Sequence, residues 1–134
     1  MGKTGLIHHC FAQEEMQERY YTFLIDIYAT KGHVRIEDID QAVQQIVNQN
    51  EEAYKDILYQ LTARQRDLLV AVSREGKARQ ITGASFIKLN KLTSASSVRK
   101  SAQSLIEKQL LTHQQGVYEV YDKFMEEWLR RDLL

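Results

Sequence analysis

The fold is decided by residues 93–122, which read TSASSVRKSAQSLIEKQLLTHQQGVYEVYD. Ser94 can cap a helix at its amino end, since a side-chain hydroxyl there accepts a hydrogen bond from a free backbone N–H. The apolar positions that follow recur at helical spacing and are Val98, Ala102, Leu105 and Ile106. The period then changes, because residues 117–121 alternate apolar and polar side chains in part and Gly116 can supply a turn. The stretch predicts a helix followed by a short hairpin.

Another helix and a brief strand are predicted upstream of this stretch. Thr62 and Gln65 have the capping-box arrangement, a hydroxyl at the cap and an amide three residues later. The helix that they open carries an apolar face and ends at Gly76, and the connector at 77–81 can hold one brief strand.

A short helix lies between that connector and the helix at Ser94. Thr82 or Ser85 can cap it, and it runs to Leu89 before a turn. Asp122 can cap a last helix after the hairpin. The order helix, strand, helix, turn, helix, hairpin, helix is that of a winged helix-turn-helix. The predicted fold class is mainly α, a winged helix-turn-helix with a small β-hairpin wing, preceded by a helical extension.

The N-terminal part predicts helices without a strand. Apolar side chains in residues 11–31 have helical spacing, and Gly32 stands where a left-handed C-cap falls. A one-sided apolar stripe follows at residues 39–47, and Asn50 can cap a further short helix.

The length and composition favour one small domain with a helical extension. We expect the extension over residues 1–60 and the winged-helix domain over residues 61–134. Hydrophobic residues make up 43% of the 134, which is enough for a packed core. No apolar run approaches the roughly 20 residues that span a bilayer, and the single cysteine, Cys10, suits a reducing compartment. We therefore expect a cytoplasmic protein that does not bind a membrane.

The net charge is zero but unevenly distributed. Residues 61–111 contain ten basic and three acidic side chains, a balance of plus seven. Residues 1–60 have a balance of minus five and residues 112–134 a balance of minus two. A basic surface attracts polyanions whatever the charge of the whole chain. The pattern favours a polyanionic partner without saying which polyanion it is.

The helix at 94–109 is the candidate recognition helix. When its apolar positions face inward, the other side carries the expected contacts to duplex DNA, which are Ser96, Ser97, Arg99, Lys100, Gln103 and Ser104. Small hydroxyls near the amino end allow close approach to phosphates, two cations can neutralise phosphates, and the Gln103 amide can read an adenine edge. The alternative is an ordinary solvated helix face, which Glu107 favours.

The hairpin turn predicts a weak wing. Gln114-Gln115-Gly116 is uncharged, and only the neighbouring His113 can become cationic. The other basic side chains considered come from three segments and are Arg64, Arg66, Lys77, Arg79, Lys88 and Lys91. They form one patch only if the fold brings them together.

No catalytic constellation is evident in the sequence. His8-His9-Cys10 offers three consecutive ligand types that cannot all point at one tetrahedral zinc ion. Gly2-Lys3-Thr4 copies the end of a phosphate-binding loop without the strand and glycine that come before it. We expect a protein that is not an enzyme, holds no metal or cofactor and has no small-molecule substrate.

Residues 61–130 resemble the C-terminal winged-helix region of a large prokaryotic group of AAA+ ATPases, relatives of origin-recognition ATPases. The matching phrases are LTARQRDLL (61–69), TSASSV (93–98), LIEKQLL (105–111), VYEVYD (117–122) and FMEEWL (124–129). Residues 11–60 resemble the last helices of the ATPase lid, where IEDI (36–39) leads into the final helices. The chain departs from the family at Lys123, where a proline is common, and at Cys10, which follows His9 in place of the usual proline.

The resemblance implies a C-terminal part of a longer ATPase, or a truncated paralogue, whose ATP-binding site is not on this chain. Two alternatives to DNA binding stay open. The first is a packing winged helix that contacts the parent ATPase core or another protein domain. The second is a free-standing winged-helix transcription regulator, which predicts a stable dimer.

Overall fold

The computed structural model describes the backbone of residues 2–132 and the side chains of residues 14–131. The chain forms two compact units, Met1–Glu52 and Ala53–Leu134. The second unit therefore includes most of the short helix α3 (Glu51–Tyr59), which the sequence pattern places in the extension.

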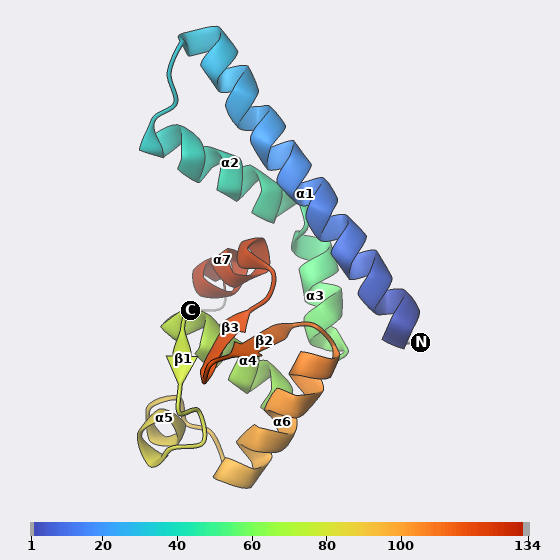
Figure 1. Cartoon of the computed structure of the whole chain (residues 1–134), viewed down its shortest axis with the longest axis vertical. Coiled ribbons are helices and arrows are strands. Elements are labelled where there is room, and N and C mark those ends of the chain that lie inside the picture. Colours follow the sequence, from blue (N-terminus) through green and yellow to red (C-terminus); the bar gives the residue numbers. More distant parts are fainter. Residues whose placement is uncertain (1, 133–134) are drawn as a thin grey trace. The chain divides into compact units, whose positions relative to one another are not determined.

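The first unit is a pair of helices in contact, α1 (Gly2–Lys31) and α2 (Ile36–Gln49) (Figure 1). α1 begins well before its predicted start at residue 11, since the chain has no proline that would interrupt it. Its predicted end is confirmed, because Gly32 has a φ of +79° and its N–H donates to the Tyr28 carbonyl at 2.7 Å. The buried side chains of this unit include Met16, Asp38, Ala42, Ile46 and Val47.

Asp38 fastens the turn between α1 and α2. Its Oδ2 accepts a hydrogen bond from the backbone N–H of Arg35 at 3.0 Å, and its Oδ1 accepts one from Lys31 Nζ at 3.2 Å. These two donors, the backbone N–H first, lower the pKa of Asp38. A carboxylate in the first turn of α2 also interacts favourably with the helix dipole.

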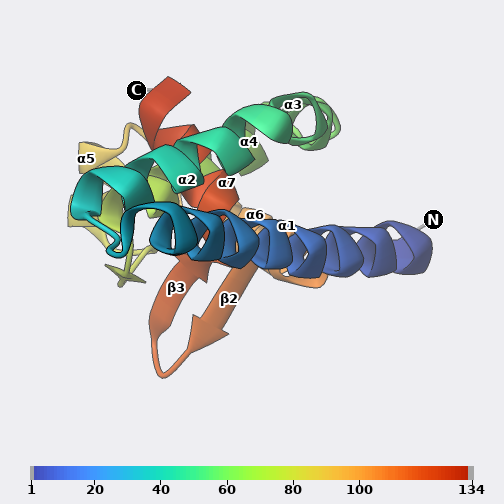
Figure 2. The ribbon, with the colours of Figure 1, turned by 90° about the horizontal axis from the view of Figure 1, so that it is seen from above.

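The second unit has the predicted winged helix-turn-helix order (Figure 1). After α3 come α4 (Ala63–Glu75), β1 (Ala78–Arg79), α5 (Ala84–Leu89), α6 (Ala95–Glu107), β2 (Leu111–Gln114), β3 (Val117–Val120) and α7 (Lys123–Asp132). The strands form one antiparallel sheet in the order β1-β3-β2, with Leu111 opposite Val120 and Ala78 opposite Tyr118. Figure 2 shows the β2–β3 hairpin projecting from the helices of its unit.

The core of this unit is built around α4. This helix contacts α6, α7 and β3, and Leu69 and Val72 on its inner face are fully buried. Leu105 of α6 and Leu129 of α7 are equally inaccessible. Replacing one such side chain with alanine costs about 2–5 kcal/mol of stability, so these contacts set the relative positions of the helices.

The local signals at the helix ends are mostly confirmed. The Thr62 hydroxyl accepts from the Gln65 N–H at 3.2 Å, and the Gln65 Oε1 accepts from the Thr62 N–H at 3.0 Å. The Ser94 hydroxyl accepts from the Ser97 N–H at 3.2 Å and so begins α6. Gly76 ends α4 with a φ of +75°.

Two predicted caps are wrong. The N-cap of α5 is Gly83, in place of Thr82 or Ser85, because a tight turn brings the Gly83 N–H to 2.9 Å from the Gln80 carbonyl. A Cβ at Gly83 would lie 3.1 Å from that carbonyl oxygen. Asn50 stands directly before α3 but acts as the C-cap of α2, since its Nδ2 donates back to the Ile46 carbonyl at 2.8 Å.

Asp122 lies buried between the hairpin and α7. Its Oδ1 accepts from the N–H groups of Phe124 at 2.9 Å and Met125 at 3.2 Å, which confirms the predicted cap. Its Oδ2 accepts from the Tyr54 hydroxyl at 3.4 Å. Burial, with the nearby Asp122 carboxylate, raises the pKa of Tyr54 above its ordinary range, so Tyr54 stays a donor.

We expect Asp122→Ala to lower the free energy of unfolding by about 1–2 kcal/mol, because it removes an N-cap and leaves buried donors without an acceptor. Urea unfolding followed by circular dichroism measures this. Asp56→Ala, at an exposed position of α3, is the control and should change stability by less than about 0.5 kcal/mol. Equal effects of the two variants would contradict the role given to Asp122.

Glu126 of α7 is a buried carboxylate whose two cationic partners on α7 lie too far away for short hydrogen bonds. Its Oε2 lies 3.6 Å from Lys123 Nζ, and its Oε1 lies 3.7 Å from Arg130 Nη2. Oε2 has no hydrogen-bond partner among the described residues. Burial raises the pKa of Glu126, and the two cations oppose this only in part.

Glu126→Gln should therefore stabilise the protein more at pH 7 than at pH 4. The pKa of Glu126 is higher in the folded protein than in the unfolded chain. As the pH rises from the unfolded to the folded pKa, the wild type therefore loses stability relative to the glutamine variant, whose side chain stays neutral. Urea unfolding of both proteins between pH 4 and 7 measures the difference. An advantage of the glutamine variant that shrinks with rising pH would contradict this.

Candidate nucleic-acid interface

The inner and outer faces of α6 divide as its apolar spacing predicts. Val98, Ala102 and Leu105 are buried, and Ser101 is buried with them. On the outer face, Ser96, Arg99, Lys100 and Gln103 are exposed, whereas Ser97 and Ser104 are half-buried. The helix therefore presents a narrow polar surface with two cations.

Two of the expected contact residues have partners within the unit. Gln65 Nε2 of α4 donates to the Ser104 hydroxyl at 3.0 Å, so this hydroxyl ties α6 to the first turn of α4. Gln103 Nε2 donates to Glu107 Oε1 at 3.4 Å, a long bond between two exposed side chains. Water can replace the second bond more easily than the first.

The distinction between these two residues can be tested. We expect Ser104→Ala to lower the free energy of unfolding by about 0.5–1.5 kcal/mol, since it removes a hydrogen bond between two helices. Gln103→Ala should change stability by less than about 0.5 kcal/mol, since it is an exposed position. Thermal unfolding of the two variants checks this, and the reverse order would contradict it.

The basic side chains of residues 61–111 are almost all available to a ligand. Arg66 is the exception, because its Nη1 donates to the carbonyls of Leu58 at 3.2 Å and Leu61 at 2.7 Å. The other nine side chains are exposed and are Arg64, Arg74, Lys77, Arg79, Lys88, Lys91, Arg99, Lys100 and Lys108. Within the described part of the chain none of these nine forms an ion pair.

The cations of α7 behave differently. Lys123 lies 3.3 Å from Glu119, Arg130 lies 3.4 Å from Glu127, and Arg131 lies 3.4 Å from Glu127. The cations of α7 are thus paired with carboxylates of α7 and β3, whereas the nine exposed cations of residues 64–108 form no ion pair with a described side chain. Unpaired exposed cations concentrate positive potential over the surface that carries them.

Two of the nine cations lie beside the start of α6. Arg64 of α4, Lys91 of the turn and Ser97 of α6 line one small crevice of about 20 Å³. Asp67 lines it as well and offsets part of the charge. The sequence did not reveal this convergence, because Arg64 lies on α4, 27 positions before Lys91 in the chain. An expected contact residue, Ser97, and two further cations therefore share one surface.

The wing has an uncharged tip. Gln115 and Gly116 form the two-residue turn, both with positive φ, of 52° and 77°. The His113 ring stacks on the Tyr118 ring of the opposite strand at 3.9 Å between centroids. The imidazole is thus engaged with its own hairpin, which agrees with the weak wing predicted from the sequence.

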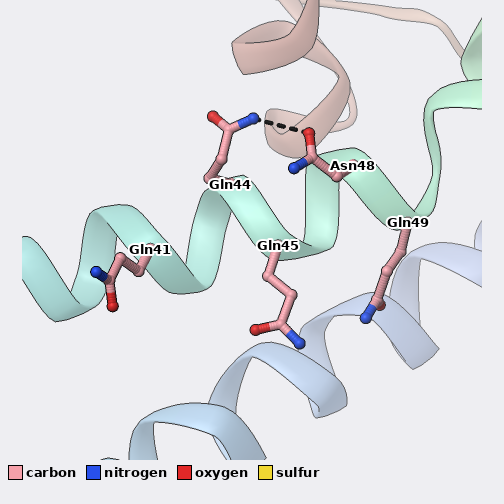
Figure 3. A pocket seen from close by; sticks show the side chains of 5 residues that line it. All are labelled: Gln41, Gln44, Gln45, Asn48 and Gln49. Carbon is pink, nitrogen blue, oxygen red and sulfur yellow. Dashed lines mark hydrogen bonds between the residues drawn. The ribbon is translucent and has the colours of Figure 1, made fainter.

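A larger hollow lies along α2 in the first unit and measures about 440 Å³. Figure 3 shows that its lining consists of amide side chains, Gln41, Gln44, Gln45, Asn48 and Gln49, with Gln44 Nε2 donating to Asn48 Oδ1 at 2.8 Å. This lining has no charged group and no nucleophile, so it offers nothing that favours a phosphate or a chemical step.

The side chains of the two N-terminal motifs, Gly2-Lys3-Thr4 and His8-His9-Cys10, lie outside the described residues. Among the side chains that are described, no three histidine, cysteine or acidic groups gather as metal ligands do. In the same part of the chain, no helix has both the length and the apolar character required to cross a bilayer.

A comparison to protein families supports the fold of the second unit. A family model described as a probable winged helix domain matches residues 52–131, more than half of the chain. The chain belongs to this winged-helix family. The match begins at the residue before the second compact unit and ends within α7, so it covers every element of that unit. No curated protein and no solved structure matches the chain.

Proposed function

We propose that this winged helix is a non-catalytic module that binds duplex DNA, with α6 entering the major groove. The observation that carries the proposal is the set of nine exposed cations of residues 64–108 that form no ion pair with a described side chain, four of which lie on α5, the turn and α6. Phosphate contacts supply most of the affinity of such proteins, and each contact requires a lysine or arginine side chain that is free to pair with a phosphate.

The roles of the side chains follow from their positions. Arg99 and Lys100 of α6 neutralise phosphates on one side of the groove, and Arg64 and Lys91 contact the backbone beside the start of the helix. The exposed Ser96 and the half-buried Ser97 allow the backbone to approach closely. Gln103 is the residue for base readout, since its amide can pair with an adenine edge.

We further propose that the chain is the C-terminal part of an AAA+ type ATPase and is not itself an enzyme. The sequence phrases of residues 61–130 support the relationship. The described residues contain no catalytic constellation, so nucleotide hydrolysis in this proposal takes place on a part of the parent protein that this chain does not include.

A second candidate function is a packing surface for another protein domain. The uncharged hairpin turn, Glu107 at the far end of α6 and the exposed Leu89 at the end of α5 favour it. In this case the winged helix contacts a protein partner, and its cations serve solubility.

A DNA titration separates the two functions. We expect fluorescence anisotropy with a duplex of about 20 base pairs to show salt-dependent binding. Arg99→Ala and Lys100→Ala should each weaken it and lower the slope of log affinity against log salt by about 1 per lost phosphate contact. Arg131→Ala is the matched control, because it removes one exposed cation that is already paired with Glu127.

The absence of binding at about 50 mM salt, where phosphate contacts are strongest, would overturn the proposal in favour of the packing surface. An equal loss in Arg131→Ala would show that net charge alone determines the affinity and that α6 is not the contact surface.

A further inference from the structure

An apolar stripe runs along the side of α1 that faces away from the core of its unit. Tyr21, Ile25 and Tyr28 are separated by four and three residues, so they lie on one face of the helix. Their exposed fractions are 60%, 66% and 60%. Met16 is buried and lies nine residues before Ile25, which is two and a half turns and therefore the opposite side.

The stripe is more than scattered surface hydrophobicity. Of the nine large hydrophobic side chains exposed among the described residues, three form this stripe, and three more follow in the turn and on α2, Val34, Ile36 and Ile39. The Tyr21 ring also meets the Tyr20 ring edge-on at 5.4 Å between centroids, which restricts its rotamers. A contiguous apolar face that is held in place is typical of an interaction site.

The charges at the two ends of the stripe are opposite. Glu14 and Glu18 precede it, are exposed, and form no ion pair with any described side chain. Lys31 and Arg35 follow it, and both are exposed, although Lys31 also pairs with Asp38. The stripe therefore has carboxylates before it and cations after it, with Arg19 at the acidic end paired to Glu15 at 3.7 Å and Asp26 exposed beside Ile25.

We propose that a second copy of this chain covers the stripe, with the two α1 helices antiparallel. In that arrangement Tyr21 lies against Tyr28 of the second copy, because the two residues are equally distant from the middle of the stripe. Glu18, three residues before Tyr21, then faces Lys31 of the second copy, three residues after Tyr28. A parallel pair would place the acidic ends together.

The pairing is self-complementary, as a two-fold interface requires. Its apolar part consists of three side chains from each copy, which makes it smaller than a standard interface, so the dimer should be weak and concentration-dependent. The inference is independent of the proposed DNA binding, since it concerns the other unit and no nucleic acid takes part.

Sedimentation equilibrium of the full chain without DNA tests the proposal. The apparent mass should rise above 15.7 kDa towards twice that value as the concentration increases. Ile25→Glu should weaken the association at least about tenfold, because it places a charge in the proposed dimer interface, where the second copy covers the apolar side chain of Ile25. Tyr59→Glu is the matched control and should leave it unchanged, since Tyr59 is 88% exposed in the second unit and belongs to no proposed contact surface.

Cross-linking tests the orientation on a Cys10→Ser background. A mixture of Tyr21→Cys and Tyr28→Cys proteins should form the mixed disulfide in preference to either symmetric one. A mass that stays at 15.7 kDa at all concentrations, or equal effects of Ile25→Glu and Tyr59→Glu, would overturn the proposal. Preferential symmetric disulfides would overturn the antiparallel arrangement.

Discussion

The burial of one face of α4 is the constraint on which the rest of the winged helix depends. Leu69 and Val72 are fully buried on this face, and the helix contacts α6, α7 and β3 together. Polar bonds fasten both of its ends to these neighbours. At the amino end Gln65 donates to Ser104 of α6, and at the carboxyl end Arg130 Nε of α7 donates to the Ser73 carbonyl at 2.6 Å. The direction of α6 is therefore a consequence of how α4 packs.

The second unit contains two kinds of cation, those of α7 that are paired with carboxylates and those of residues 64–108 that are not paired with a described side chain. On α7, each described cation lies within 3.4 Å of a carboxylate of β3 or of α7 itself, so the cations of this helix add little to the external field, although the buried Glu126 keeps one oxygen without a partner among the described residues. The nine exposed cations of residues 64–108 have no such partner among the described side chains, and this arrangement costs stability through mutual repulsion unless an anion is bound. Such a surface is maintained more readily where a polyanion is the partner than where a protein of mixed charge is.

Local chemistry made much of the fold predictable from the sequence. Thr62, Ser94 and Asp122 act as caps because each bonds to backbone groups two or three residues away, and Gly76 ends its helix through its own φ. The role of Gly83 as N-cap of α5 was missed because it depends on the close approach of the Gln80 carbonyl, which cannot be predicted from the residue types. The start of α1 was missed because the absence of a breaking residue is a weaker signal than a cap.

Of the candidate site, only the outer face of α6 could be predicted from the sequence; the side chains that other elements bring beside it could not. Apolar spacing identified the outer residues of α6, but the position of Arg64 and Lys91 beside Ser97 depends on how α4 crosses α6, which is tertiary. The partner of Ser104 is hidden for the same reason, since Gln65 lies 39 positions away in the sequence. Nor does a sequence distinguish a cation that is used internally, such as Arg66, from one that is free.

Arg66 also has a mechanical consequence. One nitrogen of its guanidinium donates to the Leu58 carbonyl in the last turn of α3 and to the carbonyl of Leu61, the second residue beyond that helix, while its backbone belongs to α4. A force that displaces the end of α3 must carry α4 with it or break bonds to a charged donor that contribute about 1.5–3 kcal/mol each. Arg66 thus couples the position of α3 to that of α4, and α4 is packed against α6. A displacement of α3 can therefore tilt α6, the helix proposed to lie in the groove.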